Sequence, residues 1–550
     1  MVILLLACTQ PETTPVPVAP ADPGDDPVAD PGDDTVSTEE TDLLGPVGAL
    51  SRASLDLRGI RPSAAEIELV EADPDAYADQ VEAFLYDSRF PDRVRDLFAT
   101  IYLTRMDYYY VTAADFGLSD QPGFVASVGE EPLRVLAKIA EDDLPYSDVV
   151  TADWTMADEN IGRAFPTDYP ADGTGWQQVH YTDGRPAAGV LSTNGLWWRY
   201  MTNTSNLNRG RANAISRIFV CNDYLSHPIE FDRDVNLLDS DALSDALKNN
   251  EGCVACHSTL DPLASYLFGF YYLDYTSKLD TTWYHPEREQ MWRSTNEVEP
   301  GYYGEPGYSL SDLGVQIASD TRLPECLAEQ TFELLLQRDA ELADTQTLSD
   351  NREAILDGGF TVRAAVRAVV LSDEYARGVA PDGTFAAKML TVDQLGSVLE
   401  DLTGFRFTYA GYDLLGSDSY GVRTLAGGVD GVYATKPADQ PTATSSLVLE
   451  RVGQAAAWYV TEHDRDNADD RRLFTEITFR ETPDSDRDAM VAQIQALHLR
   501  LFGDRIEADG PEVEADLALW QDLYDAEGDR AAAWADLLSV LFRDPEFLFY

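Results

Sequence analysis

The run Cys253-Val254-Ala255-Cys256-His257 constrains what this chain can fold into more than any other feature. Two thiols three positions apart can each form a thioether with a vinyl group of a haem, and the imidazole that follows then lies beneath the iron as its proximal ligand. The whole chain has only 5 cysteines and 6 histidines, so their grouping here is specific for attachment chemistry. The run therefore predicts one covalent c-type haem, held by Cys253 and Cys256, with His257 as the ligand of the iron.

Two other interpretations of the same run remain open. The two cysteines could form a redox disulfide, as other Cys-x-x-Cys motifs do. They could also join Cys221 and either His257 or His227 in a structural zinc site. The histidine directly after the second cysteine, and the Asp261-Pro262 step downstream, favour haem over both.

The second axial ligand of the iron has three candidates in the sequence. Met201 precedes the run, Met291 follows it, and His285 is a third choice. Methionine raises the reduction potential and suits electron transfer, and small class I cytochromes supply it from the downstream side, where Met291 lies. An open position at the iron is the remaining alternative.

Other residues near the run are expected to complete the haem pocket. Pro262 is expected to end the helix of the motif, so that a nearby backbone carbonyl accepts a hydrogen bond from His257. Arg209 and Arg211 are candidate partners for the haem propionates. The apolar residues that follow are expected either to pack the haem edge or to form ordinary core; they are Leu263, Leu267, Phe268 and Phe270.

The N-terminal residues predict export and lipid anchoring. Leu5-Leu6-Ala7-Cys8 resembles a lipobox, in which Cys8 is acylated, and residues 1–8 are then the end of a truncated signal whose true start lies upstream. Residues 9–46 are acidic and rich in proline. Because such a segment has little apolar surface to bury, it predicts a disordered tether between the lipid and the folded part.

Charge and cysteine usage agree with a location outside the cytoplasm. The formal net charge of −57 repels nucleic acid and anionic membrane surfaces, which argues against both as binding partners. Cys221 and Cys326 remain once the haem and lipid cysteines are assigned, and in an exported protein they predict a disulfide. Two buried free thiols are the alternative. The sequence has neither a second Cys-x-x-Cys-His run nor the common hydrolase and phosphate-binding motifs.

Periodicity predicts a mainly α fold with several domains and long loops. A capping box formed by Ser63 and Glu66 predicts a helix start, and Thr391 caps another helix. Further helices are expected over 75–86, 91–102, 132–139, 310–319, 325–338, 362–371, 446–459, 487–501, 513–524 and 531–542. Loops are expected over 106–128, 160–190, 279–308 and 411–445.

These elements predict three folded domains after the tether. Residues 47–185 are expected to form an N-terminal helical domain, 186–380 a cytochrome c-like haem domain, and 381–550 a C-terminal helical domain. Two stretches echo each other weakly, because 335–375 and 501–547 each lead through helices to an aromatic residue near their end.

Several stretches carry a resemblance to a known family. They are 55–63, 145–154, 189–210, 260–264, 360–375 and 545–550. In these stretches the chain resembles the planctomycete- and myxobacterial-type cytochrome c-like surface proteins, which are mostly uncharacterised. The proline-rich segment usual before their haem motif is reduced here to His227-Pro228. The resemblance implies haem attachment and export, and says little about a substrate.

Together these features predict an exported, lipid-anchored, mono-haem protein at the outer membrane, the cell surface or in the periplasm, which passes electrons to an unidentified redox partner. A second hypothesis is a non-redox binding or scaffold lipoprotein with a link to glycans, in which the Cys-x-x-Cys-His run is a structural staple or a metal site. A third is an oxidoreductase in which an open position at the iron binds a small ligand.

Overall fold

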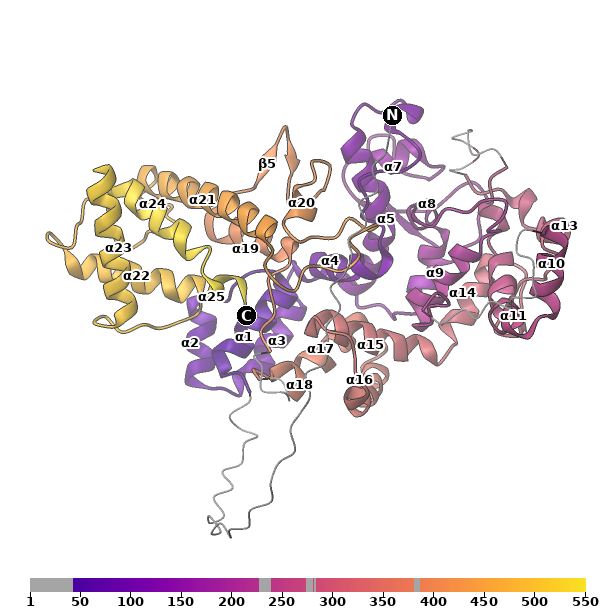
Figure 1. The fold of residues 1–550 in the computed structure, drawn as a ribbon, viewed down its shortest axis with the longest axis horizontal. Coiled ribbons are helices and arrows are strands. Elements are labelled where there is room, and N and C mark those ends of the chain that lie inside the picture. The colour runs from indigo at the N-terminus through magenta and orange to yellow at the C-terminus, as the bar shows by residue number, and fades with distance from the viewer. Residues whose placement is uncertain (1–42, 227–238, 274–279, 281–282, 380–385) are drawn as a thin grey trace, which may run out of the picture. The chain divides into compact units, whose positions relative to one another are not determined.

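The computed structural model describes residues 43–226, 239–273, 280, 283–379 and 386–550 (Figure 1). The predicted acylation site Cys8, residues 9–42 of the predicted tether and His227 of the zinc alternative lie outside the described residues. Helices make up 58% of the structure and strands 4%, which confirms the prediction of a mainly α protein. Among the described residues, no helix combines the length and the apolar character needed to cross a bilayer.

Helices are the main regular elements of the described residues, and Figure 1 colours them in chain order. Before residue 227 they are α1 (Pro46–Arg58), α2 (Ala64–Ala72), α3 (Ala76–Leu85), α4 (Phe90–Tyr102), α5 (Gln121–Glu141), α6 (Asp148–Thr151), α7 (Glu159–Ala164), α8 (Asn194–Arg199) and α9 (Arg209–Val220). Over 239–379 they are α10 (Ser240–Asn249), α11 (Glu251–Ser265), α13 (Trp292–Thr295), α14 (Leu310–Ala318), α15 (Arg322–Leu336), α16 (Thr345–Asp357), α17 (Val362–Val370) and α18 (Asp373–Ala376). Over 386–550 they are α19 (Val392–Thr403), α20 (Val422–Leu425), α21 (Ala443–Asp466), α22 (Arg487–Leu501), α23 (Pro511–Glu527), α24 (Arg530–Leu541) and α25 (Pro545–Leu548).

Strands in the described part of the chain are short antiparallel pairs. They pair β1 (Thr155–Ala157) with β2 (Gln177–Val179), β3 (Gly301–Tyr302) with β4 (Glu305–Pro306), and β5 (Thr408–Tyr409) with β6 (Tyr412–Asp413). Short 3-10 helices occur at Ala113–Phe116, Gly189–Ser192, Phe268–Phe270, Pro286–Arg288 and Leu342–Asp344. The predicted loops over 160–190, 279–308 and 411–445 therefore contain short regular elements, while most of the residues that the structure describes there are irregular.

Side-chain caps set several helix starts where the sequence predicts them. The hydroxyl of Ser63 accepts the N–H of Glu66 at 3.3 Å, and the carboxylate of Glu66 accepts the N–H of Ser63 at 2.7 Å. This capping box begins α2 and confirms the prediction. Thr391 and Gln394 form the same arrangement at the start of α19. The helix predicted over 487–501 is α22, with the same bounds.

Helix α5 is longer than the helix predicted over 132–139. Asp120 caps its start, eleven positions before the predicted one, and Pro132 lies inside the helix rather than at its beginning. Proline has no N–H, so the carbonyl of Val128, one turn earlier, lacks its usual helical donor. Gly195 at the start of α8 packs against this carbonyl, since a Cβ at that position would lie 2.1 Å from the Val128 oxygen. Only glycine therefore permits this approach of α8 to α5.

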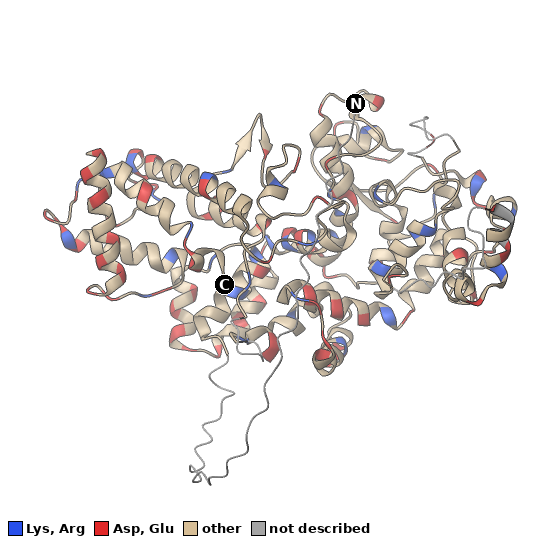
Figure 2. Cartoon of the chain, viewed as in Figure 1, with Lys and Arg blue, Asp and Glu red and all other residues tan. Residues whose placement is uncertain are grey.

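Two large hydrophobic cores stabilise the described residues. One core draws its side chains mainly from residues 50–375, so residues on both sides of the expected boundary at 185/186 share it. The other draws from residues 390–547, together with Leu55 of α1. Smaller clusters include Trp198 and Trp292. Acidic residues occur on helices throughout the described part of the chain rather than in one segment (Figure 2).

Candidate functional site

The Cys-x-x-Cys-His run lies in the first half of helix α11. The side-chain oxygen of Asn250 begins this helix by accepting the N–H groups of Gly252, at 3.1 Å, and Cys253, at 3.4 Å. Cys253 and Cys256 are three positions apart, so they lie on one face of the helix, and both thiols are unpaired and partly exposed. The second half of α11 is buried in the first core through Leu260, Leu263 and Ala264. The core therefore holds the helix, and Cys256 packs against it while both cysteines remain partly exposed.

The imidazole of His257 is held by a carboxylate on the same helix. Its Nδ1 lies 2.9 Å from Oδ1 of Asp261. Arg209 of α9 binds this carboxylate with two hydrogen bonds, from Nε to Oδ1 at 2.6 Å and from Nη2 to Oδ2 at 3.0 Å. Burial alone would raise the pKa of Asp261, but the hydrogen bonds from His257 and Arg209 hold it below its usual range. With Nδ1 engaged, Nε2 is the nitrogen of His257 left to bind a metal.

The prediction that Pro262 ends the helix of the motif is wrong. Helix α11 continues through Pro262 to Ser265 rather than ending there, and a side-chain carboxylate, not a backbone carbonyl, binds His257. Asp261 follows His257 by four positions, which brings the two side chains together on a helix. This spacing is the sequence signal that identifies the pair.

The three candidate second ligands of the iron have other neighbours. Met291 packs against Phe268, Tyr271 and Trp292. Met201 is 42% exposed and lines a small cavity together with Trp197, Arg211 and Tyr272. Both ring nitrogens of His285 lie within hydrogen-bond distance of oxygens, namely Oε1 of Glu287 at 3.2 Å and the carbonyl of Asp280 at 3.1 Å. None of these contacts includes a residue of the Cys-x-x-Cys-His run.

The arginines expected near the propionates already have partners within the protein. Arg209 holds Asp261, as described above. Arg211 is buried, which lowers its pKa to about 10, and it donates to the backbone carbonyls of Tyr200 and Phe270 at 2.8 Å and 3.0 Å. The apolar residues expected at a haem edge or in the core are buried; they are Leu263, Leu267, Phe268 and Phe270.

The disulfide between Cys221 and Cys326 contradicts the zinc alternative, because both of its forms need Cys221 as a ligand. The two sulfur atoms are bonded at 2.06 Å, so Cys221 is not free to bind a metal. Within the described ranges, no three His, Cys, Asp or Glu side chains are grouped so as to hold a metal ion by themselves. The other alternative, a disulfide between Cys253 and Cys256, is also absent from the structure, because both cysteines are unpaired.

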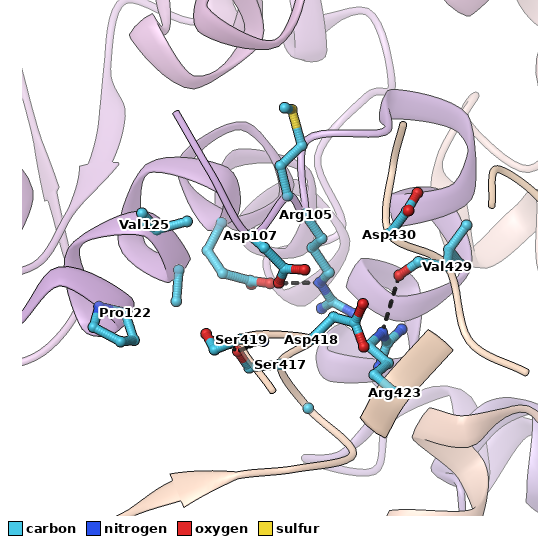
Figure 3. A pocket seen from close by; sticks show the side chains of 14 residues that line it. Arg105, Asp107, Pro122, Val125, Ser417, Asp418, Ser419, Arg423, Val429 and Asp430 are labelled. Atoms are coloured by element: carbon cyan, nitrogen blue, oxygen red, sulfur yellow. Dashed lines mark hydrogen bonds and ion pairs between the residues drawn. The ribbon is translucent and has the colours of Figure 1, made fainter. Parts of the chain in front are cut away.

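A second group of titratable side chains lines a small pocket between the loop before α5 and the segment around α20 (Figure 3). Asp107, Asp418 and Asp430 face this pocket of about 60 Å³. Burial, and then the neighbouring Asp418 carboxylate, raise the pKa of Asp107 to about 6. Both arginines of the pocket, Arg105 and Arg423, are already paired with carboxylates outside this acidic group.

A larger cavity of about 550 Å³ lies among α4, α15 and the start of α19. Its walls include Leu97, Ile101 and Leu334, and the exposed ion pair between Lys436 and Asp339 also lines it. Neither cavity is lined by a residue of the Cys-x-x-Cys-His run. Sequence periodicity could not identify these cavities, because each is formed by segments hundreds of residues apart.

Comparison with known proteins gives no relative for this chain. No family model matches it, and no curated protein and no solved structure is significantly similar to it. The chemistry and geometry of helix α11 are therefore the basis for assigning a function.

Proposed function

We propose that this protein is an exported, lipid-anchored electron carrier with a single covalent haem c, related to the planctomycete- and myxobacterial-type cytochrome c-like surface proteins. One observation carries the proposal. Two unpaired thiols lie on one face of a capped helix, directly before an imidazole whose Nδ1 is fixed by Asp261. Thioether attachment needs accessible thiols, and ligation needs an imidazole held in one orientation.

The residues of α11 have distinct roles in this proposal. Cys253 and Cys256 would hold the haem through two thioethers, and Nε2 of His257 would bind the iron. When bound, the haem supplies a carrier of one electron. No residue is assigned as a second ligand of the iron, and Met201 and Met291 stay the two candidates that would be tested.

The disulfide supports the proposed compartment. Disulfides persist in oxidising compartments outside the cytoplasm, and Cys221–Cys326 is such a bond between α9 and α15. The lipobox-like Cys8 and the acidic residues that follow it agree with attachment to a membrane by lipid. Export and covalent haem are thus supported by separate parts of the chain.

Spectroscopy of the purified protein tests the proposed activity. The protein would be produced in a periplasm that contains c-type maturation enzymes, and a reduced-minus-oxidised absorption spectrum recorded. We expect reversible changes in sharp haem bands. Carbon monoxide bound by the reduced form would indicate an open position, whereas Met201→Ala or Met291→Ala should change the spectrum if that residue is the ligand. A protein that takes up haem but shows no reversible reduction would contradict electron transfer.

A further inference from the structure

We infer that Asp261, clamped by Arg209, is a positioning residue that sets the reduction potential of the haem; this inference rests on the function proposed above. Asp261 does not itself touch the iron in this scheme. It acts through His257, whose Nδ1 lies 2.9 Å from its carboxylate. The inference depends on one property of this contact: the group that accepts the hydrogen bond from His257 is an anion rather than a neutral carbonyl.

An anionic acceptor changes what His257 offers to a metal. A carboxylate that accepts the Nδ1–H attracts the proton more strongly than a carbonyl does, so the imidazole becomes a more basic ligand through Nε2. A more basic ligand stabilises the higher charge of oxidised iron. Hydrogen bonds to the residues that bind the iron, and charges near them, are among the features by which proteins tune haem potentials. Asp261 is therefore expected to lower the potential of this site.

Arg209 works in the opposite direction and also fixes the geometry. It binds both oxygens of Asp261, at 2.6 Å and 3.0 Å, so the carboxylate cannot rotate away from His257. Its positive charge also offsets part of the negative charge of Asp261. The carboxylate is only 10% exposed, so water screens this pair of charges weakly. Removing either partner thus changes the charge near the iron, with opposite signs.

The two variants give opposite predictions for the haem-loaded protein. Asp261→Asn keeps the side-chain shape but removes the anion, so the ratio of reduced to oxidised protein at a fixed potential should rise at least tenfold, or about 59 mV for one electron. Arg209→Gln removes the cation, and the same ratio should fall. Arg338→Gln is the matched control, since Arg338 also binds an aspartate through two hydrogen bonds and its hydrogen-bond partners Asp339 and Asp344 lie outside α11. It should leave the ratio unchanged.

These signs separate a positioning role from a purely structural one. Damage to the fold would move both variants in one direction, or would broaden both titrations. Shifts of the same sign, or shifts no larger than that of Arg338→Gln, would overturn the inference. Covalent haem in each variant, checked on a denaturing gel, shows that the potential and not the attachment has changed.

The protein without haem provides a test that does not depend on the proposed function. Full-length protein made in a periplasm without c-type maturation enzymes would be labelled with ¹⁵N-histidine, and the His257 signals identified by their loss in His257→Gln. In its neutral form, wild-type His257 should carry its ring proton on Nδ1, the nitrogen that faces the carboxylate of Asp261. Asp261→Ala should lose this preference. A proton on Nε2 in the wild type would overturn the inference, while absence of covalent haem in the matured protein would count against the proposed function alone.

Discussion

Tyr550 donates its hydroxyl to the buried carboxylate of Asp56 at 2.7 Å, across 494 positions of the sequence. Tyr375 donates to the same carboxylate at 2.6 Å, and the ammonium group of Lys388 also binds it. All four side chains are buried or nearly so, and they come from α1, α18, the segment before α19 and the last residue. Asp56 therefore links α1 to α18, to the segment before α19 and to the last residue of the chain.

The ends of the two stretches that echo each other in sequence have similar anchors. Nη1 of Arg52 donates to the carbonyl of Tyr375 at 2.7 Å, and Nη2 of Arg61 donates to the carbonyl of Phe547 at 2.8 Å. Tyr375 and Phe547 are both fully buried. Each stretch thus ends in a buried aromatic residue whose carbonyl is bound by an arginine in or just after α1.

Replacing Lys388 by methionine is expected to lower the free energy of unfolding by about 3–5 kcal/mol, because it leaves the buried Asp56 carboxylate without its cation. The measurement is urea denaturation near neutral pH, below the pKa of about 8 that burial gives Lys388. Lys436→Met is the control, since Lys436 and Asp339 are each 75% exposed and such pairs contribute about 1 kcal/mol or less. If both variants lowered the free energy of unfolding by similarly small amounts, the Asp56 carboxylate would not depend on Lys388 for its stability.

The carboxylate of Glu131 is expected to make stability depend on pH. It is fully buried on α5 and accepts the N–H groups of Asn194, at 3.1 Å, and Gly195, at 3.2 Å. Burial raises its pKa from 4.5 to about 7. Between these pH values the folded protein holds a proton that the unfolded chain has lost. Glu131 therefore contributes stability that is fully present below about pH 4.5 and is lost as the pH rises to about 7.

Glu131→Gln isolates this contribution from the other carboxylates. Between about pH 4.5 and about pH 7, the free energy of unfolding of the wild type should fall by a contribution from Glu131 on the order of 3 kcal/mol. Gln cannot ionise, so the variant should lack this contribution. Urea denaturation at a series of pH values measures the difference between the two proteins. A difference that does not change with pH would contradict the assignment.

Removal of the disulfide is expected to lower the free energy of unfolding by about 2–5 kcal/mol. The bond closes a loop with a sequence separation of 105, and this loop includes all of α11. The double variant Cys221→Ser, Cys326→Ser should therefore unfold at lower urea concentration than the wild type. Added reductant should destabilise the wild type and leave the double variant unchanged. Equal sensitivity of both proteins to reductant would assign the effect to other thiols.

Much of the helical structure could be predicted from local sequence signals. The capping box at Ser63 and the periodic run of α22 depend on residues a few positions apart, which a linear pattern shows directly. Helices α5 and α11 were predicted less well because each continues through a proline, at Pro132 and Pro262. Tertiary packing supports both helices despite the missing N–H.

The site could be predicted only in part. The attachment residues form one continuous run, so their place on a single helix follows from the sequence. The pairing of Asp261 with Arg209 does not follow from the sequence, because Arg209 lies 52 positions earlier and contacts Asp261 only when α9 packs beside α11. The same limit applies to Asp56 and Tyr550, which are joined by tertiary structure alone. Periodicity indicates which face of a helix is buried, and not which side chain it will meet.

The pyridine haemochrome spectrum of the denatured, solvent-extracted protein tests the central claim most directly. After expression with c-type maturation enzymes, we expect the haem to stay with the polypeptide and to show the spectrum of a porphyrin with two thioethers. Cys253→Ala and Cys256→Ala should each leave one vinyl group intact and shift the spectrum accordingly. Extraction of all haem from the wild-type protein would contradict attachment at Cys253 and Cys256, and so would retention of haem by a protein that carries both Cys253→Ala and Cys256→Ala.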